Sequence, residues 1–199
     1  MTGTKLGYME YLMTSAPNFK PKRNGVIAIS AMQNERENTD LRELNLPAKS
    51  RYAYFIDSCF KNIKRKSFKK RLQSLAEDFD NDFFVSKTHK ERYISCENDS
   101  AIFCGNHKKR LAIIYLLSSD SYLWEFIRCD NNFNKSLSNI KIRNLDTSSY
   151  AIFKTAKMAQ TGKEHIKISE LADDELIDNN TFKVIINSFL LLKYGEKIF

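Results

Sequence analysis

Apolar residues recur at helical spacing along the chain from residue 48 onward. Two stripes begin this pattern: Tyr52, Phe55, Ile56, Cys59 and Phe60, followed by Phe68, Leu72, Leu75 and Phe79. Residues three, four and seven apart share one face of a helix, so each stripe predicts an amphipathic helix with one buried face. A pair of helices is therefore expected between residues 48 and 82.

Further helices are predicted downstream. Ser86 is suited to the N-cap of a helix that runs through residue 94. The run Leu111–Leu117 predicts a strongly apolar helix, and a shorter helix that carries Trp124 follows it. The last three helices are expected to run from Asp146 or Ser148 to Gly162, from Ser169 to Ile177, and from Asn179 or Asn180 to Gly195.

Residues 1–47 do not share this pattern. They hold all three prolines of the chain, and Val26–Ile29 is a short β-capable run that predicts one strand or a short hairpin. We expect an irregular or partly β N-terminal segment that leads into a helical domain over residues 48–199. The predicted fold class is mainly α, a single-domain bundle of about six helices.

Composition narrows the class of protein. A chain of 199 residues with 42% hydrophobic positions can bury one substantial core. The longest apolar runs, 111–117 and 189–192, are far shorter than the roughly 20 residues of a transmembrane helix, and residues 1–12 lack the apolar run of a signal peptide. Four irregularly spaced cysteines are typical of reduced thiols. We therefore expect a cytoplasmic protein.

Charge is unevenly distributed along the chain. The formal net charge is +8, and residues 151–199 contribute none of this excess. The densest run of cations contains no acidic residue and consists of Lys61, Lys64, Arg65, Lys66, Lys69, Lys70 and Arg71. Cations on the exposed face of the second amphipathic helix could neutralise phosphates, which predicts a nucleic acid or nucleoprotein partner. The alternatives are a solvated face, or pairing with the acidic stretch at residues 77–82.

A second candidate site combines His89, Arg92 and Tyr93. These positions share one face of the predicted helix, and an imidazole, a guanidinium and a phenol together can bind a phosphate or a carboxylate. The competing interpretation is that His89 satisfies a buried backbone group while Tyr93 packs in the core.

Metal and catalytic chemistry is weakly indicated. Cys104-x-x-His107 has ligand-like spacing, but no second close pair completes a zinc site with Cys96, His89 or Cys129. The same cysteine and histidine are the one candidate for a nucleophile and its base. The stretch 78–82 has the alternating carboxylates of a calcium loop but lacks its glycine and its closing glutamate. We assign no metal, cofactor or catalytic residue.

Several motifs in the second half of the chain carry a family resemblance. They are Phe83-Phe84-Val85-Ser86 with His89, Arg92 and Tyr93, then Arg110–Leu117 with Leu123-Trp124, then Ile168-Ser169-x-Leu171, and finally Tyr194-Gly195. On these motifs, residues 83–195 resemble a family of short uncharacterised helical proteins from phages and integrative elements of Gram-positive bacteria. The resemblance implies an α-helical part over residues 83–199 and a mobile-element context. It implies no catalytic residue.

These observations favour a non-enzymatic protein that binds an acidic macromolecule. Such a protein would inhibit a host-defence nucleoprotein or serve as an accessory DNA-binding protein of a mobile element. A self-associating structural protein and a small enzyme that uses His89 or Cys104 remain the alternatives.

Overall fold

The computed structural model describes residues 46–97, 106–129 and 137–199. Within these ranges the chain is helical and forms no strand, which confirms the mainly α prediction. These ranges hold eight α-helices, as many as the helical segments predicted one by one and more than the overall figure of about six, together with two 3-10 helices. They are α3 (Ala48–Phe60), α4 (Lys66–Glu77), α5 (Lys87–Glu97), α6 (His107–Ser118), α7 (Ser121–Cys129), η3 (Leu137–Asn139), α8 (Thr147–Thr161), α9 (Ile168–Leu171), α10 (Asn179–Tyr194) and η4 (Gly195–Ile198). The β-capable run at 26–29 lies outside the described residues.

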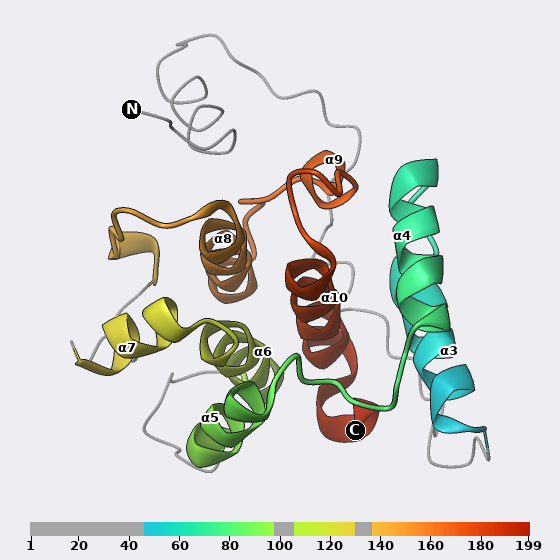
Figure 1. The fold of residues 1–199 in the computed structure, drawn as a ribbon, viewed down its shortest axis with the longest axis horizontal. Coiled ribbons are helices and arrows are strands. Elements are labelled where there is room, and N and C mark those ends of the chain that lie inside the picture. The colour runs from blue at the N-terminus through green and yellow to red at the C-terminus, as the bar shows by residue number, and fades with distance from the viewer. Residues whose placement is uncertain (1–45, 98–105, 130–136) are drawn as a thin grey trace, which may run out of the picture.

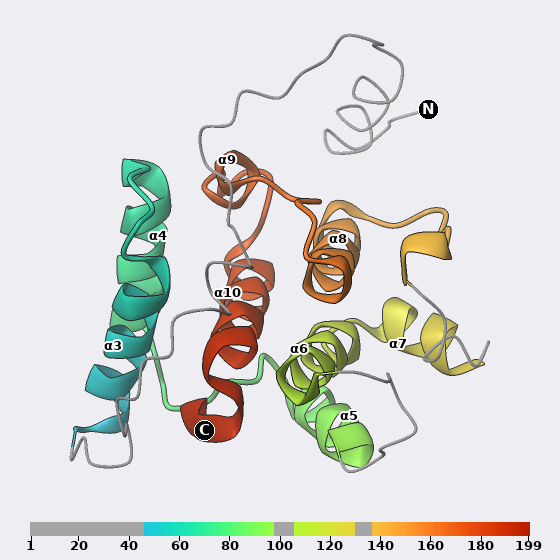
Figure 2. The same ribbon diagram turned by 180° about the vertical axis from the view of Figure 1, so that it is seen from behind.

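Helix α10 runs through the middle of the bundle (Figures 1 and 2). Helix α6 packs along it, α8 contacts both, and α5 and α7 lie on the outer side of α6. The α3–α4 hairpin packs on the opposite side of α10, while the short helix α9 contacts α4. Helices α10 and α6 are thus covered by neighbours on several sides, whereas α4 has one side against the bundle.

This arrangement explains the sequence patterns of the central helices. All residues from Leu111 to Ser118 in α6 are buried, and so are nearly all residues from Thr181 to Tyr194 in α10. A helix that is apolar around its whole circumference needs neighbours on every side. The continuous apolar run at 111–117, predicted to be a strongly apolar helix, accordingly forms the centre of the core.

The two N-terminal stripes form the interface between the hairpin and α10. Every member of the first stripe is buried, and in the second stripe Phe68, Leu72 and Phe79 are buried while Leu75 is partly buried. The Phe60 and Phe68 rings meet edge to face at 5.6 Å, across the turn that joins the two helices. The predicted pair of amphipathic helices is therefore confirmed, although Phe79 lies beyond the end of α4.

Local capping signals placed several helix ends correctly. The Ser86 hydroxyl accepts a hydrogen bond from the His89 amide at 3.1 Å, and the Asp146 carboxylate accepts one from the Ser149 amide at 2.7 Å. Helix α8 ends at Gly162, whose φ of 71° lies in the left-handed region that suits glycine.

Two predicted ends near the C-terminus are wrong. The acidic helix expected from Ser169 to Ile177 gives way to turns after Leu171. There the Asp173 carboxylate accepts from the Leu176 amide at 3.2 Å, and the Asp173 carbonyl accepts from the Ile177 amide at 3.0 Å. The helix in this region, α9, lies earlier, over Ile168–Leu171. The N-cap of α10 is Asp178, whose carboxylate accepts from the Thr181 amide at 2.9 Å, rather than Asn179 or Asn180.

Candidate nucleic-acid interface

The basic run does not lie on a single helix. Lys61 follows the last residue of α3, Lys64 and Arg65 lie in the connecting turn, and α4 begins at Lys66. The Ile63 amide donates to the Phe60 carbonyl at 3.0 Å in this turn. The expectation that the run lies on the second amphipathic helix is wrong for Lys61, Lys64 and Arg65, because the chain must reverse between residues 60 and 68 for both apolar stripes to face the bundle.

Four lysines of the run are exposed and have no ion-pair partner in the part of the chain that the structure describes. Lys64, Lys66, Lys69 and Lys70 are exposed, and none of them forms an ion pair with any carboxylate of the described residues. At 100° per residue, the three lysines of α4 fall on one face, opposite the buried side chains of Phe68 and Leu72. We call these four lysines the basic surface.

Arg71, the last cation of the run, points the other way. Its Nη1 donates to the carbonyls of Leu171 at 2.9 Å and Asp173 at 3.2 Å, and its Nη2 donates to the Ile177 carbonyl at 2.8 Å. The guanidinium also lies 4.1 Å from the centre of the Phe182 ring. Partial burial lowers the Arg71 pKa, and the nearby Asp174 counteracts that shift. Arg71 therefore ties α4 to the α9–α10 connection and does not belong to the basic surface.

The start of α4 also favours anions. Arg65 occupies the N-cap position, and no side chain of the described residues caps the helix there. The Arg65 Nε instead donates to the Ser67 hydroxyl at 3.2 Å, and the first turn holds no acidic residue. The free amides of a helix N-terminus carry partial positive charge, so they add to the field of the lysines beside them.

The acidic stretch at 77–82 does not neutralise the basic surface. Asp80 lies 3.6 Å from the Lys183 ammonium of α10, and its pKa is lowered first by a hydrogen bond from the Asp82 amide and then by Lys183. The Asp82 carboxylate accepts from the Phe84 amide at 2.9 Å, and the Glu77 carboxylate accepts from Gln73 at 2.9 Å. Within the described ranges these carboxylates are engaged elsewhere.

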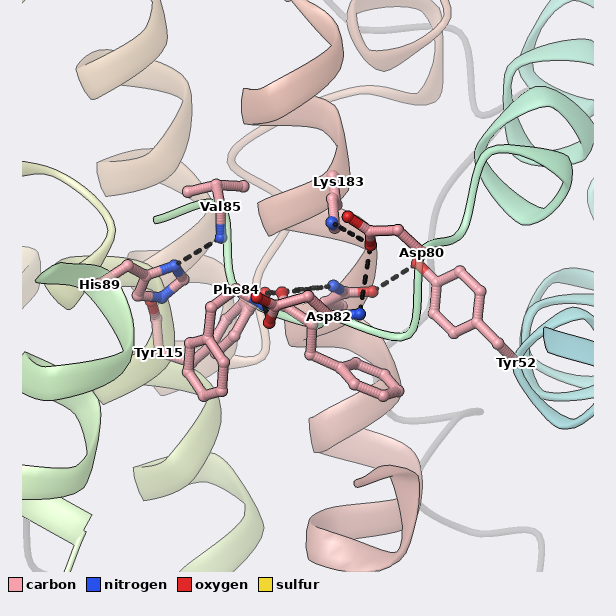
Figure 3. Close-up of polar contacts among 10 residues, drawn as sticks. Tyr52, Asp80, Asp82, Phe84, Val85, His89, Tyr115 and Lys183 are labelled. Atoms are coloured by element: carbon pink, nitrogen blue, oxygen red, sulfur yellow. Dashed lines mark hydrogen bonds and ion pairs between the residues drawn. The ribbon is translucent and has the colours of Figure 1, made fainter. Parts of the chain in front are cut away.

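The second predicted site is part of the core. His89 is 1% exposed, and its Nε2 donates to the Tyr115 carbonyl at 2.9 Å while its Nδ1 faces the Val85 amide at 3.4 Å (Figure 3). Burial lowers the His89 pKa to about 4. Tyr93 is buried, and Arg92 donates to the Ser121 hydroxyl at 3.2 Å. The competing interpretation, in which His89 satisfies a buried backbone group and Tyr93 packs, is the one observed.

A buried hydrogen-bond network lies beside His89, and the sequence patterns did not predict it. Asn187 of α10 is fully buried; its Oδ1 accepts from the Tyr52 hydroxyl at 2.7 Å, and its Nδ2 donates to the Phe83 carbonyl at 3.0 Å and the Tyr115 hydroxyl at 3.1 Å. The Tyr115 hydroxyl donates to the same Phe83 carbonyl. Figure 3 follows these contacts from His89 on one side to Tyr52 on the other. The one sequence signal for this network was Asn187, a polar residue within the apolar stretch of α10.

The candidate metal or nucleophile residues are not brought together in the described part of the chain. Cys96 is buried, His107 is exposed and lies 3.0 Å from the Glu196 carboxylate, and Cys104 lies outside the described residues. No group of three histidine, cysteine or acidic side chains among the residues described could hold a metal ion.

Comparisons with protein-family models, with curated proteins and with solved structures found no match. The resemblance of residues 83–195 to the mobile-element family stays a prediction. Of the helices described, none is long and apolar enough to cross a membrane.

Proposed function

We propose that the basic surface binds the phosphate backbone of a nucleic acid, either free or within a nucleoprotein. The observation that carries this proposal is the set of four exposed lysines, Lys64, Lys66, Lys69 and Lys70, without an ion-pair partner among the described residues. Each lysine that contacts a phosphate releases a condensed counterion, which adds salt-sensitive affinity without sequence preference.

The position of these lysines favours an external anion. Lysines spaced three and four apart on one helix face repel each other by a few tenths of a kcal/mol per pair. A polyanion removes this repulsion and also faces the uncapped start of α4. Arg71 differs from these lysines, because its guanidinium donates hydrogen bonds to backbone carbonyls of the same chain and so is not available to an external anion.

The apolar content of the surface favours nucleic acid over a protein partner. None of the large apolar side chains exposed in the described residues falls in the run from Lys61 to Arg71. Protein interfaces have an apolar, often aromatic centre, whereas contacts to phosphates use cations and backbone amides. Ile63 and Phe68, the apolar residues of the run, are partly or fully buried.

The biological role follows from the family resemblance as a further expectation. In a mobile-element context, the same contact would let the chain inhibit a host-defence nucleoprotein or act as an accessory DNA-binding protein. Both roles require the basic surface, so one binding experiment tests their common basis.

The experiment compares two triple charge reversals by fluorescence anisotropy with a labelled DNA duplex and a labelled single strand. The first variant combines Lys66→Glu, Lys69→Glu and Lys70→Glu. The matched control combines Lys141→Glu, Arg143→Glu and Lys163→Glu, three exposed cations elsewhere. The two variants have the same net charge, so they separate a local surface from a general effect of charge.

We expect the first variant to weaken binding by at least about tenfold and to lower the slope of log K against log salt by about one for each lost contact. The control should change the dissociation constant by less than about threefold. Equal losses in the two variants would mean that net charge alone attracts DNA. A wild-type protein that binds neither duplex nor single strand at low salt would contradict the proposal outright.

A further inference from the structure

A small apolar pocket lies at the opposite end of the α3–α4 hairpin from the basic surface. It has a volume of about 350 Å³ and is formed by the start of α3, the α4–α5 connection, α5 and η4. Phe83, Phe84, Ile94 and Phe199 contribute to its wall. The Phe199 ring stacks on Phe84 at 5.9 Å and meets Phe83 edge to face at 5.3 Å. The pocket is therefore lined largely by aromatic rings.

The pocket exposes apolar surface to solvent. Ile94 is 50% exposed and Phe199 is 43% exposed, and these are two of the five large apolar side chains that are exposed among the described residues. A cluster of exposed apolar side chains around a concave surface is a common feature of binding sites.

Two cations line the same pocket. Arg51 of α3 is half-buried, and its guanidinium makes no hydrogen bond or ion pair with the described residues. Lys90 of α5 has its ammonium 6.0 Å from the centre of the Phe84 ring and pairs with no carboxylate in the described ranges. The Asp82 carboxylate also lines the pocket and accepts a hydrogen bond from the Phe84 amide at 2.9 Å. The charged groups of the lining are therefore two cations and one carboxylate, and this excess of positive charge favours an anionic ligand.

We propose that this pocket binds a small aromatic monocarboxylate. The aromatic body packs against Phe83, Phe84 and Ile94, and the carboxylate pairs with Arg51. Rings offer edge and face contacts to another ring, and a guanidinium matches the planar geometry of a carboxylate. A volume of about 350 Å³ lies at the lower end of the range for small-molecule sites, so the ligand has one or two rings.

This site is separate from the nucleic-acid interface. Arg51 lies near the start of α3 and the basic surface follows its end, and a helix of 13 residues is about 20 Å long. The pocket has an apolar wall, two cations and the Asp82 carboxylate, whereas the basic surface has four exposed lysines and no exposed large apolar residue. The two proposals can therefore fail independently.

The test uses the full chain and two probes, 2-naphthoate and its neutral analogue 2-naphthamide, in ligand-observed NMR titrations. We expect saturable binding of 2-naphthoate with a dissociation constant of about 1 mM or lower, which is typical of a ligand of this size. The amide should bind at least about fivefold more weakly, because it carries no charge to pair with Arg51.

Two pairs of variants locate the site. Arg51→Gln should weaken 2-naphthoate at least about fivefold and leave the amide nearly unchanged, whereas Arg143→Gln, which removes an exposed cation elsewhere, should affect neither. Ile94→Glu should weaken 2-naphthoate strongly, and Tyr122→Glu, at another exposed apolar position, should not. Circular dichroism confirms that each variant is folded.

Several results would overturn the proposal. They are equal affinity for the two probes, equal losses in Arg51→Gln and Arg143→Gln, or no saturable binding of 2-naphthoate. A concentration-dependent dimer that Ile94→Glu dissociates would instead assign the pocket to a second copy of this chain. The Lys66→Glu, Lys69→Glu, Lys70→Glu variant should still bind 2-naphthoate with wild-type affinity.

Discussion

The buried centre of the bundle and the exposed face of the α3–α4 hairpin use polar groups in opposite ways. In the centre, the side chains of Tyr52, His89, Tyr115 and Asn187 are hydrogen-bonded to one another or to backbone carbonyls. On the hairpin, the four lysines of the basic surface have no ionic partner among the described residues. A buried polar group without a partner costs about 1–3 kcal/mol, whereas an exposed lysine costs little. Exposed positions such as those on the hairpin can therefore keep charge available for binding.

Arg71 and Lys70 show this difference at adjacent positions. Arg71 donates to three carbonyls of the α9–α10 connection, while Lys70 is exposed. One residue along a helix turns the side chain by 100°, which is enough to move a cation from the interface with the bundle to solvent. Cations in one run of the sequence therefore have two different roles.

The largest effect is expected from Asn187→Leu. The substitution removes the acceptor of the Tyr52 hydroxyl and one donor to the Phe83 carbonyl in a fully buried site. We expect the free energy of unfolding to fall by about 3–4 kcal/mol, as measured by urea denaturation. Asn180→Leu, at an exposed position of the same helix, serves as the control and should change stability by less than about 0.5 kcal/mol. Equal effects at the two positions would contradict a stabilising role for the network.

The second effect is a loss of stability in acid through His89. Its pKa of about 4 in the folded protein lies below the ordinary value of 6.5, so the unfolded chain binds a proton more readily. Stability is therefore lost as the pH falls through about 6.5, and this loss is complete below about 4. Between pH 7 and 4.5 we expect the loss in the wild type to exceed that in His89→Gln by about 2–3 kcal/mol.

Urea denaturation of the wild type and of His89→Gln at a series of pH values measures this difference. The carboxylates are the same in both proteins, so their contribution to the pH dependence cancels. The proton uptake of His89 can also be followed by NMR in the unmodified protein. A midpoint near the ordinary histidine value would contradict the assignment of His89 as a neutral donor to the Tyr115 carbonyl.

The third effect separates the two adjacent cations of α4. Arg71→Met leaves the carbonyls of Leu171 and Ile177 without their donor, and we expect a loss of about 1–2 kcal/mol in the free energy of unfolding. Lys70→Met should change stability by less than about 0.5 kcal/mol but should weaken DNA binding severalfold. The reverse pattern, with Lys70 important for stability and Arg71 for binding, would invalidate the distinction between them.

The sequence predicted features that depend on neighbouring residues. Helix α8 begins after Asp146 and ends at Gly162, as predicted, because a cap needs only a side chain or a glycine within one turn of the helix end. The stripes that contain Phe60 and Phe68 likewise identified two buried helix faces. The position of the turn between those helices was not predicted, because the cations of residues 61–66 are compatible with a helix. The contact between the two rings requires the chain to reverse there.

The candidate site was predicted in part. The residue types of the basic surface were evident, but the inward orientation of Arg71 was not, because its carbonyl partners lie 100 or more residues away in the chain. His89, Arg92 and Tyr93 share a helix face, yet the partner of His89 is the Tyr115 carbonyl of α6. The spacing of residues shows which side chains share a helix face. It does not show whether that helix face is exposed to solvent or packed in the core.

Periodicity, capping and charge are properties of neighbouring residues, so the helical class, the buried stripes and the concentration of positive charge before residue 72 could all be predicted from the sequence. Long-range contacts, in contrast, make Arg71 and His89 part of the fold, join three segments at Asn187, and place Arg51 and Ile94 in the lining of one pocket. A polar side chain becomes structural or available according to the partner it meets, and in this protein those partners come from distant parts of the chain.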